Sequence, residues 1–367
     1  MKGRRHIGFF GVLALAAMLV AQPVAAPRAL PSSLTDADFW ALVTDISEPG
    51  GYFRITDNFT SNEREVGQLF TMLRERGVQG GVYLGVGPEQ NFSYIASIKP
   101  AMAFVVDIRR QAVMQHLMFK AAFELSKDRA DFISLLFARP RPAGLDASTP
   151  VQKLWEAYGE VPTDAAAVPK NIARLVEHLT KTHKFTLTVE EAGQLDWVLQ
   201  AFTSYGPSIS TRGAGPNFQR GTGGDGTFAG LTGWALDAGG QPQSFLSAEE
   251  HFRTVKALHE KNLIVPVSGD FGGPKAIRAI GAYLRKQGGT LSAFYVSNVE
   301  QYLFQDGKDR AFYENVATLP LSDTSVFIRP YSLRRAGGTS LCGMTAFLKA
   351  ARDGRVYSNN DALACMR

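Results

Sequence analysis

The sequence predicts an α/β protein built around a doubly wound, mostly parallel sheet. Short apolar runs at 81–84, 102–106, 263–267 and 291–296 alternate with longer segments of helical periodicity. This alternation is typical of parallel sheets, whose strands are joined by crossover helices. The second run contains no polar residue, as expected for a strand that helices cover on both faces.

Residues 1–26 are expected to be a signal peptide or an N-terminal anchor. Lys2, Arg4 and Arg5 precede an apolar run at 7–21, and small residues follow it. That run is shorter than the roughly 20 apolar residues of a membrane span. We therefore expect an exported, periplasmic protein. The alternative is an uncleaved segment that anchors the protein to a membrane.

The charge balance argues against a nucleic-acid partner. The formal net charge is +5, and the leader supplies three of the cations and no acid. No dense stripe of Lys and Arg occurs elsewhere in the chain, so the basic character gives no footprint for nucleic acid. The expected partner is a small-molecule ligand.

Residues 36–367 are expected to form one α/β domain with an insertion at about 143–244. Helical periodicity predicts three helices in the insertion. A glycine-rich stretch at 206–240 follows them, and we interpret it as a cover over a site. The two cysteines, Cys342 and Cys365, form either a disulfide, which an oxidising compartment permits, or two free thiols.

Helical periodicity also gives the expected bounds of the connecting helices. Ser61 is expected to begin a helix, with Glu63 in its first turn, where the helix dipole favours an anion. Further helices are expected at 89–98, 110–139, 247–261, 275–286, 299–304 and 345–352.

The first strand and the residues after it carry the clearest signal for a ligand site. Gly85 and Gly87 interrupt the apolar run, so the backbone can turn sharply and approach a ligand closely. Asp107 ends the second run, 22 residues after Gly85. In doubly wound sheets an acid at this place binds ribose hydroxyls. The alternative is a tight turn with a solvated aspartate.

The carboxylate of Glu89 argues against ligands that carry a pyrophosphate. It lies where a dinucleotide site requires a third small residue, and a carboxylate beside a pyrophosphate is repulsive. This disfavours NAD and FAD. A ligand with an amino group or a single carboxylate suits the turn better, and S-adenosylmethionine carries both groups.

The glycine turn and the acid that follows it resemble the first motifs of class I S-adenosylmethionine (SAM)-dependent methyltransferases. The stretches at 51–63, 83–111, 262–281 and 294–304 together resemble a bacterial family of uncharacterised, methyltransferase-like Rossmann-fold proteins. The chain departs from the motif where Tyr83 replaces an acid and Glu89 replaces a glycine.

The resemblance implies that Gly85, Gly87 and Asp107 contact a cofactor, which in class I methyltransferases is SAM. It also implies that Asp270 follows the fourth strand. Further cofactor contacts are expected from the neighbouring residues Glu89, Gln90, Asn91 and Arg109.

Polar residues after later strands and in the N-terminal segment complete the expected ligand pocket. Because ligands bind outside the carboxyl ends of parallel strands, we expect these groups to converge. They are Asn58, Asn62, Glu63, Asp270, Ser297, Asn298 and Glu300. The alternative for Asp270 and Ser297 is ordinary helix capping, and for the N-terminal group a solvated turn. No histidine shows the spacing of a metal ligand set, so no metal is expected.

Three functions follow from these observations. The first is an exported, methyltransferase-like protein that binds a nucleoside-like or amino-acid-like small molecule without turnover. The second is an active SAM-dependent methyltransferase, whose catalysis would rest on proximity and orientation. The third is a cell-envelope interaction protein.

Overall fold

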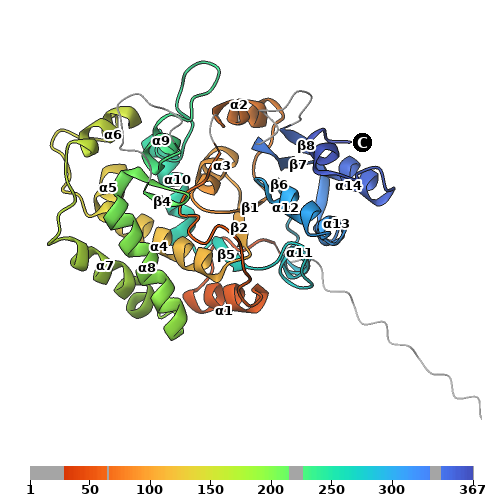
Figure 1. Cartoon of the computed structure of the whole chain (residues 1–367), viewed down its shortest axis with the longest axis horizontal. Helices are drawn as coiled ribbons and strands as arrows, with labels where there is room; N and C mark the ends of the chain where they lie inside the picture. Colours follow the sequence, from red (N-terminus) through yellow and green to blue (C-terminus); the bar gives the residue numbers. More distant parts are fainter. Residues whose placement is uncertain (1–28, 64–65, 215–225, 331–339, 367) are drawn as a thin grey trace, which may run out of the picture.

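A computed structural model describes residues 29–63, 66–214, 226–330 and 340–366 (Figure 1). A six-stranded sheet lies at its centre, with strand order β5-β2-β1-β6-β7-β8. Five strands are parallel, and β8 runs antiparallel to β7. Their bounds are β1 (Val82–Val86), β2 (Met102–Asp107), β5 (Ile264–Ser268), β6 (Leu291–Tyr295), β7 (Leu321–Ile328) and β8 (Leu341–Gly343). The predicted doubly wound, mostly parallel α/β fold is confirmed.

Counted along the chain, the six strands of this sheet have the order 3-2-1-4-5-6. The chain therefore winds outward from β1 in both directions, and β1 and β6 flank the point where the winding reverses. Ligands of such sheets bind at that point, outside the carboxyl ends of the strands. The strand before Asp270 is β5, the third and an edge strand, so the expectation that Asp270 follows the fourth strand is wrong. Ser297 follows the fourth strand.

Aromatic contacts show that helices cover both faces of the sheet. Phe104 and Phe294 both lie beside Leu84 in the register, so they share a face. Phe104 packs on Tyr283 of α11 and Phe294 on Phe312 of α13. The opposite face is covered by α3, whose Tyr94 stacks on Tyr83, and by α4. These helices are α3 (Gln90–Ile98), α4 (Arg110–Leu125), α11 (Ala276–Lys286) and α13 (Asp309–Val316).

The remaining helices surround these layers. Those outside the insertion are α1 (Asp36–Ile46), α2 (Gly67–Glu75), α10 (Glu249–Glu260), α12 (Val299–Gln305), α14 (Met344–Arg352) and α15 (Asn359–Leu363). No helix of the described residues is long and apolar enough to cross a membrane. The expected signal peptide or anchor at residues 1–26 lies outside the described residues.

Two expected helix bounds are wrong. The single helix expected at 110–139 is broken at Ser126, and α5 (Arg129–Phe137) begins after Asp128, whose carboxylate accepts the Asp131 N–H. Ser61 does not begin a helix, because α2 starts at Gly67 and the Ser61 N–H donates to a side chain elsewhere.

The expected insertion is helical and shares the core of the sheet. The three helices predicted in it are confirmed as α6 (Val151–Gly159), α7 (Val168–Glu177) and α8 (Val189–Tyr205). The strands β3 (Ile209–Ser210) and β4 (Gly213–Ala214) pair in a hairpin, and α9 (Phe228–Gly233) follows. Phe202 of α8 and Phe228 of α9 pack against Phe119 of α4, so apolar packing joins the insertion to the sheet layers.

Cys342 and Cys365 form a disulfide that fastens β8 to the end of the chain after α15. The two half-cystines are 23 residues apart in the sequence and are both buried.

Reduction of this disulfide should destabilise the protein. Opening a loop of this length increases the conformational entropy of the unfolded chain, at a cost of about 3 kcal/mol in the free energy of unfolding. Chemical denaturation with and without a thiol reductant measures the loss. A Cys342→Ser/Cys365→Ser variant should be equally destabilised and insensitive to the reductant. Equal stability of the oxidised and reduced wild-type protein would contradict the prediction.

Candidate functional site

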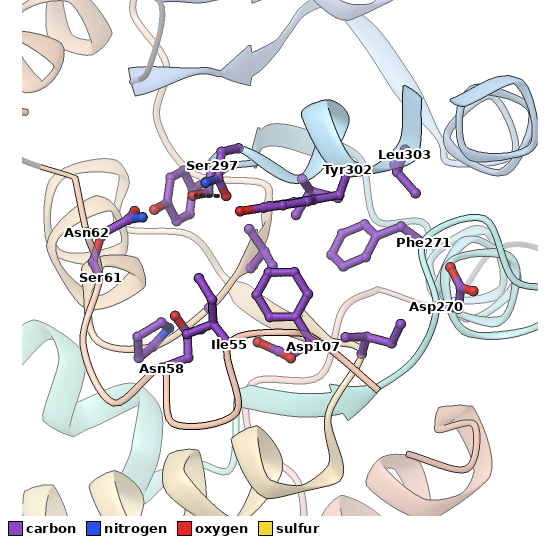
Figure 2. Close-up of a pocket in the computed structure, with 18 of the residues that line it drawn as sticks. Ile55, Asn58, Ser61, Asn62, Asp107, Asp270, Phe271, Ser297, Tyr302 and Leu303 are labelled. Carbon is purple, nitrogen blue, oxygen red and sulfur yellow. Dashed lines mark hydrogen bonds between the residues drawn. The ribbon is translucent and has the colours of Figure 1, made fainter. Parts of the chain in front are cut away.

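A cavity of about 140 Å³ lies at the carboxyl ends of the central strands (Figure 2). Its walls come from the segment before α2, from the residues that follow β1, β2, β5 and β6, and from α12. The lining residues are Tyr52, Phe53, Ile55, Asn58, Ser61, Asn62, Val86, Gly87, Pro88, Asp107, Ile108, Asp270, Phe271, Tyr295, Ser297, Asn298, Val299, Tyr302, Leu303, Asp306 and Lys308. The cavity thus lies at the reversal point of the sheet, where a ligand is expected.

The two glycines of the turn after β1 have different roles. Gly87 has φ +75°, and a Cβ there would meet no atom within 4 Å, so its backbone is open to the cavity. A Cβ at Gly85 would overlap the Oδ1 atom of Asn91 and the ring of Tyr83. Gly85 is therefore required by packing, and only Gly87 offers close approach to a ligand.

Hydrogen bonds from the buried side chains of Asn91 and His116 hold the turn in place. Asn91 Nδ2 lies 3.0, 2.9 and 2.7 Å from the carbonyl oxygens of Val86, Gly87 and Pro88. The Gly87 carbonyl also accepts a hydrogen bond of 2.9 Å from His116 Nε2. Burial lowers the pKa of His116 to about 4, so the ring is neutral at pH 7 and carries its proton on Nε2. Asn91 is thus a positioning residue, which corrects its expected cofactor contact.

Glu89 faces the protein interior. Its two carboxylate oxygens lie 3.1 and 3.0 Å from the backbone nitrogen of Ser61, so the side chain fastens the N-terminal segment to the turn. Burial raises the pKa of Glu89 to about 8. Neither Glu89 nor the buried Gln90 lines the cavity. The expectation that Glu89 lies beside a ligand and repels a pyrophosphate is therefore wrong.

Asp107 lies on the cavity wall in a buried ion pair with Arg109. Oδ1 of Asp107 accepts from the backbone N–H and Nε of Arg109, and Oδ2 accepts from Nη2 at 3.0 Å. Arg109 Nη1 donates to the backbone carbonyls of Thr56 and Asp57, at 3.2 Å each. Arg109 does not line the cavity and binds the wall segment instead, which corrects its expected role.

The segment before α2 forms the outer wall of the cavity, and Asn58 and Asn62 contribute to it (Figure 2). Gln115 of α4 donates to the carbonyl of Phe59 at 2.6 Å and so holds the segment down. Glu63 lies behind the wall, where it accepts a hydrogen bond of 2.8 Å from the lining residue Tyr295. The expected pocket contact of Glu63 is therefore indirect.

The residues after β5 and β6 close the other side. Asp270, Ser297 and Asn298 line the cavity as expected, and Asp270 is paired with Lys308. Glu300 does not line it, and its carboxylate is buried 2.6 Å from Arg329 Nε. This ion pair connects α12 to the residue that follows β7. The expectation that Glu300 contacts the ligand is therefore wrong.

The pocket expected from the sequence lacked the aromatic lining residues Phe53 and Phe271. Phe271 directly follows Asp270, so its position after a strand was the available signal. Tyr302 lies on α12, its ring is edge-to-face with Phe53 at 5.0 Å, and Arg54 stacks on it at 4.4 Å. Nothing in the sequence pairs these residues, which are about 250 positions apart.

The lining carries more negative than positive charge. Asp107, Asp270 and Asp306 contribute carboxylates, and Lys308 is the cation among the lining residues. Arg109 neutralises Asp107 and Lys308 neutralises Asp270, and the third carboxylate, of Asp306, is exposed. The described lining therefore offers no unpaired cation to a phosphate group and suits an uncharged or cationic group better.

The glycine-rich stretch supports the wall from outside. Thr211 donates to the carbonyls of Thr60 and Ser61, at 3.1 and 3.2 Å. None of its described residues lines the cavity. Residues 215–225 lie outside the described part of the chain, and with them part of the predicted cover.

Comparison with known families gives a match over most of the α/β domain. Residues 58–182 and 233–342, well over half of the chain, match the family described as Domain of unknown function (DUF7790), and the protein belongs to this family. The match includes the turn after β1, Asp107 and the segments after β5 and β6. The unmatched residues between the two parts lie within the insertion. No curated protein matches the chain.

The raised pKa of Glu89 predicts a specific pH dependence. The folded state keeps the proton up to about pH 8, whereas the unfolded state loses it near its ordinary pKa of 4.5. Between these values the unfolded state binds fewer protons, so stability falls as pH rises, by at most about 1.4 kcal/mol per pH unit.

Glu89→Gln removes this titration, so the variant should gain stability relative to the wild type between pH 5 and pH 8. Urea unfolding of both proteins across this range measures the difference in the free energy of unfolding. Parallel curves for the two proteins would contradict the raised pKa.

Proposed function

We propose that this protein is a methyltransferase-like Rossmann protein that binds a small, phosphate-free molecule of nucleoside or amino acid type. The observation that carries the proposal is the cavity itself. It lies at the reversal point of the sheet, with the open backbone of Gly87 on one side and the carboxylate of Asp107 on the next strand.

The size of the cavity favours a ring or a short side chain as the buried part of the ligand. An apolar cavity of about 150 Å³ accommodates a benzene ring, and this cavity has about 140 Å³. A complete dinucleotide exceeds this volume several-fold. Phe53, Phe271 and Tyr302 provide aromatic surface for such a ring.

The polar groups favour hydroxyl, amide or amino donors on the ligand. A carboxylate accepts about four hydrogen bonds, and Asp107 uses three of its sites on Arg109. Because Asp107 lines the cavity, its remaining acceptor site suits a ribose hydroxyl or an ammonium group. Asn58, Asn62 and Asn298 add side-chain amides.

An active SAM-dependent methyltransferase is the second candidate, and the charge of the lining favours it. The sulfonium and ammonium groups of SAM are cationic, and the lining residues include three aspartates and one lysine. In that case the adenosine part would take the place next to Asp107, and the acceptor would enter beside Ser297.

We also propose, from the basic and apolar leader, that the protein is exported and keeps at most an N-terminal link to the membrane. SAM and nicotinamide nucleotides are made in the cytoplasm. An exported protein of this class therefore either carries its ligand out or binds one outside, which favours binding without turnover.

The ligand class is tested by isothermal titration calorimetry of the full chain with adenosine, SAM, its demethylated product, ATP and NAD. We expect heat from at least one of the first three and none from ATP or NAD, because the described lining offers no unpaired cation to a phosphate group. Binding of the demethylated product and SAM supports the second candidate. Binding of NAD alone contradicts both.

Asp107→Asn tests the pocket with the bound compound. The amide keeps the size of the side chain but loses both the charged acceptor and the ion pair with Arg109, so affinity should fall at least about 10-fold, the lower bound for one charged hydrogen bond. A melting curve of the variant shows whether it is folded. Asp146→Asn, in an exposed turn, is the matched control and should bind like the wild type. Unchanged binding by Asp107→Asn would contradict the proposal that the compound binds in this cavity.

A further inference from the structure

A second cluster of polar side chains lies at the far end of α4. Glu124, His178 and His183 bring one oxygen and two nitrogens together. Glu124 Oε2 lies 2.8 Å from His178 Nε2 and 2.7 Å from His183 Nε2, and the two nitrogens are 3.2 Å apart. These atoms form a set of possible metal ligands among the described residues. The spacing of these three residues in the sequence gives no sign of such a set.

A π-helical turn creates this arrangement. His178 and His183 are five residues apart, and in an α-helix they would point about 140° away from each other. Here residues His178–Thr182 form a π turn, and the backbone N–H of His183 donates to the carbonyl of His178 at 3.0 Å. Such turns are rare and occur frequently at functional sites.

Carboxylates face both ring nitrogens of His183. His183 Nδ1 lies 2.7 Å from Asp36 Oδ1, and its Nε2 faces Glu124, so each nitrogen faces a carboxylate. Two carboxylates on opposite sides of one imidazole favour positive charge at this place, and a bound metal ion supplies such a charge.

We propose that Glu124, His178 and His183 bind a divalent cation of the zinc class, with the cation replacing the Nε2 protons. Tetrahedral zinc with ligands at about 2.0–2.1 Å separates neighbouring ligand atoms by about 3.3 Å. The nitrogen pair already has this separation, and the carboxylate oxygen reaches it by a retreat of about half an ångström. Three protein ligands leave the fourth position to water.

The surroundings match those of histidine metal ligands. Metal-binding histidines usually donate their other ring N–H to a carboxylate, and Asp36 occupies that place for His183. Lys120 Nζ holds the other oxygen of Glu124 at 2.6 Å, so Glu124 binds through Oε2 alone. The charges around the cation are then two carboxylates, of Asp36 and Glu124, and the ammonium of Lys120.

The site is independent of the cavity. Glu124 lies about 20 Å along α4 from Arg110, at the end away from the cavity. A metal ion there would join α4 to the π turn that ends α7, and through Asp36 to α1; α4 and α7 lie side by side (Figure 1). The expected consequence is a cross-link between the insertion and the core of the sheet.

Zinc titration of the untagged, metal-stripped full chain tests the proposal. We expect one zinc ion per chain by calorimetry and by elemental analysis, a higher melting temperature, and release of protons, because the Nε2 protons must leave. Cobalt should give the visible absorption of a tetrahedral site.

Variants locate the ion. His178→Gln and His183→Gln should each abolish stoichiometric binding, and Asp36→Asn should weaken it about 10- to 100-fold. His251→Gln, a histidine on α10 that is bonded to Ser247, is the matched control and should bind like the wild type. Melting curves without metal show whether each variant is folded.

The result that overturns the proposal is either no stoichiometric zinc binding by the wild type or equal binding by a folded His178→Gln variant. The first result would make the cluster a metal-free hydrogen-bond network of His178, His183, Glu124 and Asp36. The second would place the ion elsewhere on the chain.

Discussion

The carboxylate of Asp107 and the guanidinium of Arg109 form an ion pair at the end of β2, and both side chains are less than a tenth exposed. The pair connects the sheet to the outer wall of the cavity, because the same guanidinium holds the carbonyls of Thr56 and Asp57. Removing one partner of a buried pair leaves an uncompensated charge, which costs about 3–5 kcal/mol. The wall, and with it the cavity, depends on this contact.

The turn after β1 is fixed by buried side chains on the side away from the cavity. Asn91 and His116 satisfy the carbonyls of the turn, and Glu89 fastens the wall segment to it through Ser61. These groups face inward and leave the backbone of Gly87 open to the cavity. A ligand site held in this way requires little ordering when the ligand binds, and pre-organisation of this kind improves affinity.

The sequence predicted the sheet and the place of the site but not the direction of the side chains. Alternation of apolar runs with helices depends on local periodicity, so the parallel strands and the positions of Gly87, Asp107 and Ser297 at their ends could be read directly. Whether Glu89 or Glu300 faces the cavity depends on partners far away in the chain. Their partners, Ser61 and Arg329, are 28 and 29 positions distant.

The same limit explains the histidine cluster. Metal ligands on one helix are sought three or four residues apart, and a π turn changes that spacing without a sequence signal. Glu124 joins His178 and His183 only because α4 packs beside α7, which is a tertiary contact. The break after α4 did have a local signal, because residues 126–129 are all polar and Asp128 is a favourable N-cap residue for α5.

Native mass spectrometry of the full chain, isolated from the cells that make it, tests the central claim that the cavity holds a small molecule. Val299→Phe places a larger side chain in the cavity, and Val189→Phe, at a fully solvated position, is its control. We predict one phosphate-free molecule per chain in the wild type and in Val189→Phe, and none in Val299→Phe. A dinucleotide in the wild type, or the same bound mass in Val299→Phe, would contradict the account.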